Sequence, residues 1–210
     1  MDRADAWAMV ETMARMQEAH NAQVHPEWRH QGYAYYRAVW VECAELLDHF
    51  GWKWWKHQQP DIDQVKLEVV DIWHFGLSDL MRAEALDQQV ADALRSVTPE
   101  PAADTEAFRA AVEALAQQTL SERLFAMQPF VAVLDTLPLP LPDLFRMYVG
   151  KNVLNHFRQD HGYKSGDYRK TWSGREDNEH LVELLAEVDV PADEVPDTLY
   201  RALESRYRDA

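Results

Sequence analysis

Four acidic side chains stand in two pairs in the first part of the chain, and their spacing could do chemistry. Glu42 and Glu45 are three positions apart, and Glu68 and Asp71 repeat that spacing. On a helix, residues i and i+3 project from one face. Four carboxylates facing one another away from water would repel strongly, and a hard cation held by oxygen ligands would remove that conflict. The two pairs therefore predict a site for Mg²⁺, with Mn²⁺ as a substitute.

Two other interpretations of these acids stay open. Either pair alone is a common pattern on the solvated face of a surface helix. Asp71-x-x-His74 also resembles half of a helical-bundle di-iron motif, in which an acid-x-x-His recurs on two helices. The apolar neighbours of both pairs favour a buried metal site. Because no second acid-x-x-His lies near Glu42 or Glu45, His74 is interpreted as a core or supporting histidine.

The elements that must position these acids are helices. Apolar residues recur at helical spacing along most of the chain, and they predict helices over about 3–22, 36–50, 64–85, 104–118, 121–135, 143–160, 177–188 and 196–208. Gly51 is a predicted C-terminal cap, and Asp61 or Asp63 a predicted N-cap. Only 7 glycines and no sustained alternating β-branched runs argue against a sheet. The predicted fold class is all-α.

The 210 residues are expected to form one catalytic domain, 1–210, with a less constrained helical lobe at about 86–142. Residues 97–105 are interpreted as a connection, and the LPLPLPD segment as a rigid extended linker before a helix capped by Asp143. Residues 163–175 are interpreted as a loop.

Composition limits the function classes. The formal charge of −15 disfavours nucleic acid polymers and acidic membranes as partners. No apolar run approaches the roughly 20 residues that span a bilayer. The acidic, helical N-terminus does not resemble a signal peptide. The single cysteine, Cys43, fits a reducing cytoplasm.

One cationic segment stands out against this acidic background. Residues 146–175 hold seven Lys or Arg residues against two Asp residues, with tyrosines and a tryptophan between them. A compact cationic patch can bind a small polyanion such as a nucleoside triphosphate. Pairing with the chain's own acids is the alternative. Metal-binding carboxylates and phosphate-binding cations together are typical of phosphoryl chemistry.

Three separated blocks, in order, carry a family resemblance. They read ECAELLD with the following WKWWK, then KLEVVDIWHF, then YVGKNVLNHFRQDHGYKSGDYRKTWSGREDN, and MQEAHN precedes them. The chain resembles the dimeric, all-α dUTPases of the all-α NTP pyrophosphohydrolase (MazG-like) superfamily. The resemblance implies a multi-helix bundle, an obligate homodimer, and Mg²⁺-assisted hydrolysis of dUTP to dUMP and pyrophosphate, with dUDP as a second candidate substrate.

The resemblance also implies roles for particular residues. Glu42, Glu45, Glu68 and Asp71 would bind metal, and Glu42 or Glu45 would orient or deprotonate the attacking water. The implied substrate contacts fall in two groups. Those for base and sugar are Gln17, Asn21, Trp55, His74 and Phe75, and those for phosphates and closure of the site are Lys151, Asn155, Arg158, Tyr163, Lys164, Lys170 and Asn178.

Two alternatives to dUTP hydrolysis stay open. One is a related pyrophosphohydrolase that acts on dCTP or on noncanonical nucleotides. The other is a non-catalytic, nucleotide-binding helical dimer, which would bind nucleotide without releasing pyrophosphate. The intact set of four acids favours an enzyme.

Overall fold

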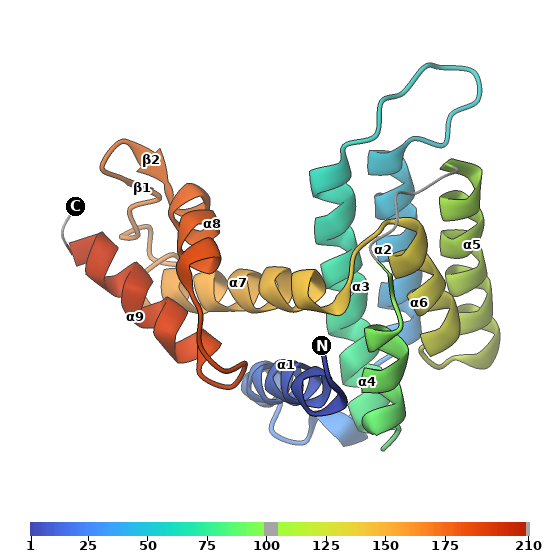
Figure 1. Cartoon of the computed structure of the whole chain (residues 1–210), viewed down its shortest axis with the longest axis horizontal. Coiled ribbons are helices and arrows are strands. Elements are labelled where there is room, and N and C mark those ends of the chain that lie inside the picture. The colour runs from blue at the N-terminus through green and yellow to red at the C-terminus, as the bar shows by residue number, and fades with distance from the viewer. Residues whose placement is uncertain (99–104, 209–210) are drawn as a thin grey trace. The chain divides into compact units, whose positions relative to one another are not determined.

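The computed structural model of the chain describes residues 1–98 and 105–208, and helices make up most of them (Figure 1). The all-α prediction is confirmed. The chain divides into two compact units, Met1–Leu144 and Phe145–Ala210. Among the described residues, no helix combines the length and the apolar character needed to cross a membrane.

The first unit is a bundle in which α2 and α3 make the most extensive contact. Its elements are α1 (Arg3–Val24), η1 (Trp28–His30), α2 (Tyr35–Phe50), α3 (Ile62–Arg82), α4 (Gln88–Arg95), α5 (Thr105–Glu122) and α6 (Met127–Thr136). Helix α3 packs against α2 and against α1, and α5 packs against α2 and α6. One helix, α3, therefore has both α1 and α2 as neighbours.

An aromatic core holds this unit together. Trp73 of α3 is fully buried and stacks on Phe130 of α6, with ring centroids 5.3 Å apart. Its indole Nε1 donates a hydrogen bond to the sulfur of Met13 on α1, at 3.3 Å. Gly76, one turn along α3, leaves room for the ring of Phe125, which a Cβ atom there would meet at 2.5 Å. Close packing around Trp73 and Gly76 thus fixes the register of α3 against α1 and α6.

The predicted cap after α2 is confirmed, and of the two N-cap candidates for α3 the structure has Asp61, although α3 begins and ends two to three residues before the predicted 64–85. Gly51 follows α2 with a φ of +94°, a conformation that glycine adopts without a steric penalty. Asp61 precedes α3, and its carboxylate accepts a hydrogen bond from the backbone N–H of Gln64. The loop between these two residues extends beyond the ends of both helices (Figure 1).

Three predictions in the middle of the chain differ from the structure. Helix α4 was not predicted, although the carboxylate of Asp87 caps it by accepting hydrogen bonds from two backbone N–H groups. The LPLPLPD segment is not an extended linker, because α7 (Leu141–Asp160) already begins inside it. Asp143 therefore lies in the first turn of α7 and not before it. The predicted connection at 97–105 falls mostly outside the described residues.

The second unit contains most of α7, a short hairpin and two further helices. The elements after α7 are β1 (Thr171–Trp172), β2 (Arg175–Glu176), α8 (Asp177–Glu187) and α9 (Val195–Arg208). The two strands pair antiparallel, with Trp172 opposite Arg175. Ser173 and Gly174 both have positive φ, which matches the twist of a two-residue hairpin turn. The predicted loop at 163–175 thus contains a hairpin.

Candidate active site

Three of the predicted acids meet where α2 and α3 pack together. Carboxylate oxygens of Glu42, Glu68 and Asp71 lie within 4.8 Å of one another. Glu68 is buried, whereas Glu42 and Asp71 are half-buried. The i, i+3 spacing on α3 brings its two acids to one face, and the packing of α2 brings Glu42 to them. We call these three side chains the acid cluster.

The acid cluster is electrostatically strained. Burial, a hydrogen bond with Glu68 and the negative charges of Asp71, Glu45 and Glu68 together raise the pKa of Glu42 to about 7. A divalent cation held by these oxygens would compensate that repulsion. Three carboxylates, with no thiolate among them, form a donor set that suits Mg²⁺ or Mn²⁺.

Glu45 lies beside the acid cluster without belonging to it. Its side chain is exposed, and its charge contributes to the raised pKa of Glu42. His49, one turn further along α2, places its Nε2 3.5 Å from a carboxylate oxygen of Glu68. Our sequence reasoning missed His49, although its i+4 spacing from Glu45 put it on the same face of α2.

A chain of polar side chains joins α1 to α3. Gln17 and Asn21 of α1 are buried at 4% and 6% exposure, which is unusual for side-chain amides. The Nε2 of Gln17 donates to the Oδ1 of Asn21 at 3.0 Å, and the Nδ2 of Asn21 donates to the Oγ of Ser78 at 3.0 Å. The Oε1 of Gln17 lies 2.8 Å from the Nδ1 of His74.

Ser78 closes this chain of polar groups, because its hydroxyl donates to the backbone carbonyl of His74 at 2.9 Å. We call Gln17, Asn21, His74 and Ser78 the amide relay. Sequence reasoning placed Gln17 and Asn21 at the base and His74 near the sugar, and it missed Ser78. A serine four positions after His74, within the apolar GLSDL segment, was the available signal.

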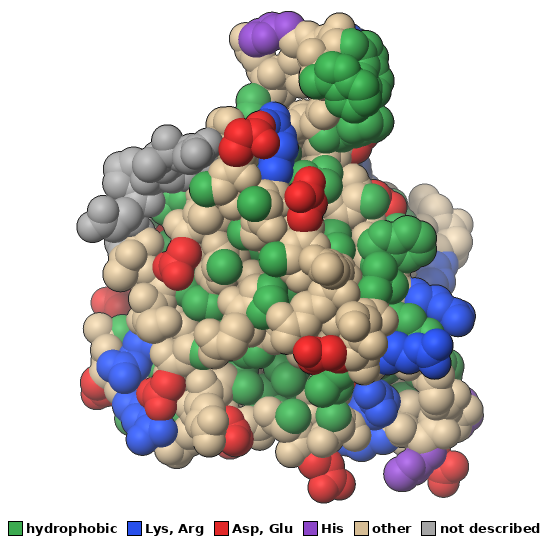
Figure 2. Space-filling model, turned by 90° about the vertical axis from the view of Figure 1, so that its right-hand side faces the viewer, with side chains coloured by type: hydrophobic (Ala, Val, Ile, Leu, Met, Phe, Trp, Pro, Cys, Tyr) green, Lys and Arg blue, Asp and Glu red, His purple; other side chains and the backbone are tan. Residues whose placement is uncertain are grey.

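The loop after α2 presents the predicted pocket tryptophan. Trp55 is 58% exposed and lies edge-on to Trp54, which is 88% exposed. Figure 2 shows hydrophobic side chains gathered on this projecting loop. The side-chain oxygen of Gln58 accepts from two backbone N–H groups of the loop, and Arg109 of α5 donates two hydrogen bonds to the carbonyl of Gly51. The lobe at 86–142 therefore anchors the start of this loop.

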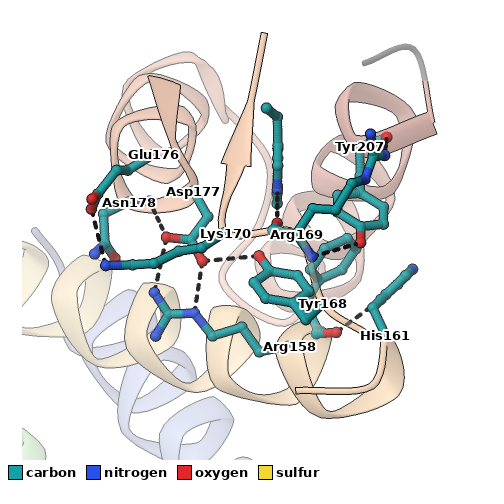
Figure 3. Close-up of polar contacts among 11 residues, drawn as sticks. Arg158, His161, Tyr168, Arg169, Lys170, Glu176, Asp177, Asn178 and Tyr207 are labelled. Atoms are coloured by element: carbon teal, nitrogen blue, oxygen red, sulfur yellow. Dashed lines mark hydrogen bonds and ion pairs between the residues drawn. The ribbon is translucent and has the colours of Figure 1, made fainter. Parts of the chain in front are cut away.

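In the second unit, the guanidinium of Arg158 is hydrogen-bonded to a carboxylate of the same chain. Its Nε and Nη2 donate to the two carboxylate oxygens of Asp177, at 2.7 and 2.9 Å (Figure 3). Asp177 is fully buried, and Tyr168 also donates to it, at 2.9 Å. Burial alone would raise the pKa of Asp177, but the hydrogen bonds from Arg158 and Tyr168 lower it below its ordinary value. The alternative of pairing with the chain's own acids thus holds for Arg158.

The other predicted phosphate contacts lie on α7, on the segment between α7 and β1, and in the first turn of α8. Lys170 forms an ion pair with Glu176 across the hairpin, at 3.2 Å (Figure 3). Lys151 is half-buried on α7. The remaining predicted contacts have exposed side chains, and these are Asn155, Tyr163, Lys164 and Asn178.

On the α1 and α3 side, Phe75 is half-buried next to His74 in the sequence. Together with Trp55 and the amide relay, it accounts for the predicted base and sugar contacts, all of which belong to the first unit.

A family model described as dUTPase matches residues 9–163, which is more than half of the chain. The matched segment contains the acid cluster, the amide relay and Arg158, while Lys164, Lys170 and Asn178 lie beyond it. A search of curated proteins gives no match.

Proposed function

The chain belongs to the dUTPase family and is a dUTP-hydrolysing enzyme, and we propose that it uses Mg²⁺ and releases dUMP and pyrophosphate. The acid cluster of Glu42, Glu68 and Asp71 is the observation that carries this proposal. Bound there, Mg²⁺ would supply charge neutralisation at the triphosphate and a Lewis acid for the reacting phosphoryl group.

Glu45 is proposed to orient the attacking water and accept its proton. It is exposed, so solvent reaches it, and it lies close enough to the acid cluster to act on the charge of Glu42. It also remains a predicted fourth metal ligand. Glu42, which lies in the acid cluster next to Glu45 on α2, is the alternative general base.

Gln17 and Asn21 are proposed to bind the uracil edge. An amide can donate and accept at once, which matches the alternating acceptors and donor of uracil. His74 and Phe75 are proposed to lie near the sugar and to exclude a ribose hydroxyl. Trp55, already exposed on its loop, is proposed to cover the base or sugar.

The phosphates are proposed to be bound by the cationic residues that follow residue 150. The guanidinium of Arg158 uses Nε and Nη2 for Asp177, so Nη1 is the atom proposed to bind a phosphate oxygen. The other proposed phosphate contacts and site-closing residues are Lys151, Asn155, Tyr163, Lys164, Lys170 and Asn178.

A homodimer is proposed as the working state. Trp40 and Val41 are 49% and 45% exposed on adjacent positions of α2, and large apolar side chains exposed within a helix are typical of an interface. A cytoplasmic location is proposed from the single, buried cysteine, Cys43.

Parallel assays of pyrophosphate release test the proposal. The assays use dUTP, dCTP, UTP and dTTP, each with Mg²⁺ and with EDTA. Release that depends on Mg²⁺, from dUTP and with little from the others, is the expected result. Release of pyrophosphate from dCTP in place of dUTP would agree with the proposed role of the acid cluster and would reject the proposed binding of uracil by Gln17 and Asn21. Nucleotide binding with no release from any substrate would indicate a non-catalytic binding protein.

A further inference from the structure

We propose that Ser78 is a positioning residue that fixes the direction of every hydrogen bond in the amide relay and so makes the base site selective for uracil over cytosine. The inference rests on the proposed binding of uracil by Gln17 and Asn21. It adds a residue that would not touch the base and a specific means of discrimination.

The direction of the hydrogen bonds in the amide relay follows from the group at its end, the backbone carbonyl of His74. The backbone carbonyl of His74 can only accept, so the contact at 2.9 Å requires the single hydroxyl proton of Ser78 to point toward it. Ser78 must then accept from Asn21, which therefore turns its NH₂ group toward the serine, at 3.0 Å. One acceptor-only group thus sets the orientation of the Asn21 amide.

The same constraint passes to Gln17 and His74. Because the Nδ2 of Asn21 faces Ser78, its Oδ1 faces Gln17, which must present its NH₂ group at 3.0 Å. The Oε1 of Gln17 then faces the Nδ1 of His74 at 2.8 Å and can only accept, so Nδ1 carries the proton. Ser78 therefore also determines which ring nitrogen of His74 is protonated, although the two side chains do not exchange a proton.

Burial makes reversal of the relay costly. Gln17, Asn21 and Ser78 are 4%, 6% and 1% exposed, so little water can replace a lost partner. Turning one amide over would place two donors or two acceptors face to face, unless every member of the relay reversed. Full reversal would require the hydroxyl of Ser78 to donate to Asn21. Its hydrogen bond to the backbone carbonyl of His74 would then be lost.

Fixed amides discriminate between the two pyrimidines. Uracil presents an acceptor at O4 and a donor at N3, whereas cytosine presents a donor at N4 and an acceptor at N3. The relay bonds of Asn21 use one N–H and one lone pair of its amide, and the base would meet the other N–H and the other lone pair. Amides free to rotate could adapt to either base. Amides held in one direction by Ser78 offer only one pattern, so the wrong base leaves buried polar groups unpaired.

The experiment compares Ser78→Ala with Ser78→Thr, which keeps a hydroxyl at the same position. Thr12→Val is the matched control, because Thr12 is also a buried hydroxyl, 1% exposed, on α1 and outside the relay. The first readout is the protonated ring nitrogen of His74 in the substrate-free protein, measured by ¹⁵N NMR with His74→Gln to assign the signal. The second is kcat/KM for dUTP relative to dCTP.

The wild-type protein, Ser78→Thr and Thr12→Val are expected to hold the proton of His74 on Nδ1. Ser78→Ala is expected to populate the Nε2-protonated form and to lose roughly tenfold in dUTP over dCTP selectivity, about the effect of one buried hydrogen bond, mainly through KM for dUTP. An unchanged proton position in Ser78→Ala would overturn the inference. So would a changed proton position with unchanged selectivity, or equal losses in Thr12→Val.

The NMR readout needs no substrate, so it separates this inference from the proposed function. A wild-type protein that does not hydrolyse dUTP would reject the function while still reporting the direction of the relay. If Ser78→Thr does not fold, Ser78→Ala against Thr12→Val still decides the outcome.

Discussion

The protonation of Glu42 links the metal to the stability of the first unit. Burial, the hydrogen bond with Glu68 and nearby acids hold its pKa at about 7, above the ordinary 4.5. The folded protein therefore binds a proton more tightly than the unfolded chain does. A divalent cation and that proton compete for the same oxygens, so metal binding is expected to weaken as the pH falls below 7.

The first prediction is a pH-dependent stability of the metal-free protein. The contribution of Glu42 is fully present below the unfolded pKa of 4.5 and is lost as the pH rises to about 7, because the folded state must then give up its proton. Thermal unfolding in EDTA between pH 4.5 and 8 measures it. Glu42→Gln should remove this part of the slope, and Mg²⁺ should offset the loss near neutral pH. Identical slopes for wild type and Glu42→Gln would contradict it.

The second prediction concerns Glu45. Glu45→Gln is expected to lower kcat for dUTP by about 10²–10⁴-fold, the usual contribution of a general base, with an unchanged melting temperature because the side chain is exposed. Glu113→Gln, which changes an exposed glutamate on α5, is the matched control. Wild-type turnover in Glu45→Gln would remove this residue from the mechanism and favour Glu42 as the base.

At the scale of elements, local signals predicted helices well and longer-range partners poorly. The caps at Gly51 and Asp61 were read correctly, since each depends on backbone geometry within a few residues. The hairpin at 171–176 was missed because two-residue strands carry no alternating pattern, although Ser173-Gly174 is a turn signal. Helix α4 was missed in a segment where Asp87 was the only strong start signal.

In the candidate site, too, local features could be predicted from the sequence and long-range contacts could not. The shared face of Glu68 and Asp71 could be predicted because i, i+3 spacing on a helix is a local property, whereas the approach of Glu42 depends on the packing of α2 against α3. The partner of Arg158 could not, because Asp177 is brought to it by the packing of α8 in the second unit. His49 and Ser78 were missed for a related reason, since their roles depend on which face of a neighbouring helix they meet.

The third prediction tests the pair that fixes the second unit. Arg158→Ala should destabilise the fold by about 3 kcal/mol, because Asp177 would remain buried without its ionic partner. The pKa of Asp177 is lowered in the folded state, so its contribution to stability is present above the ordinary 3.8 and is lost as the pH falls through the folded pKa. Acid unfolding of wild type and Arg158→Ala measures both effects.

Lys164→Ala is the matched control for Arg158→Ala, because Lys164 is a predicted phosphate contact whose side chain is exposed. It should leave stability unchanged and raise KM for dUTP. If Arg158→Ala keeps wild-type stability and changes only KM, Arg158 serves the substrate and not the fold.

At the scale of the whole molecule, the family match explains the helical architecture and the activity, while assembly remains a proposal. Exposed tryptophans lie in two places, on α2 at Trp40 and on the loop after it at Trp54. Both are large enough to serve as anchors of an interface. Substitution of each tryptophan distinguishes these two candidate interfaces, because a dimer would have to bury only one of them against a second copy of the chain.

The fourth prediction is that Trp40→Ala weakens the dimer. A loss of about 2 kcal/mol, roughly thirtyfold in Kd, is the expected cost of truncating an interface anchor. Sedimentation over a range of protein concentrations measures it, with Trp54→Ala as the control for an exposed tryptophan at 88% exposure. Dissociation by Trp54→Ala and not by Trp40→Ala would place the interface on the loop.

Helix α3 carries an acid of the cluster at Asp71 and the end of the amide relay at Ser78, about two turns or roughly 10 Å apart along its axis. Both positions lie within one continuous helix, so movement of the loops leaves the distance between them unchanged. A descendant of this chain could therefore acquire a new base preference through substitutions around Ser78, while the residues around Asp71 that serve the phosphate chemistry stayed in place.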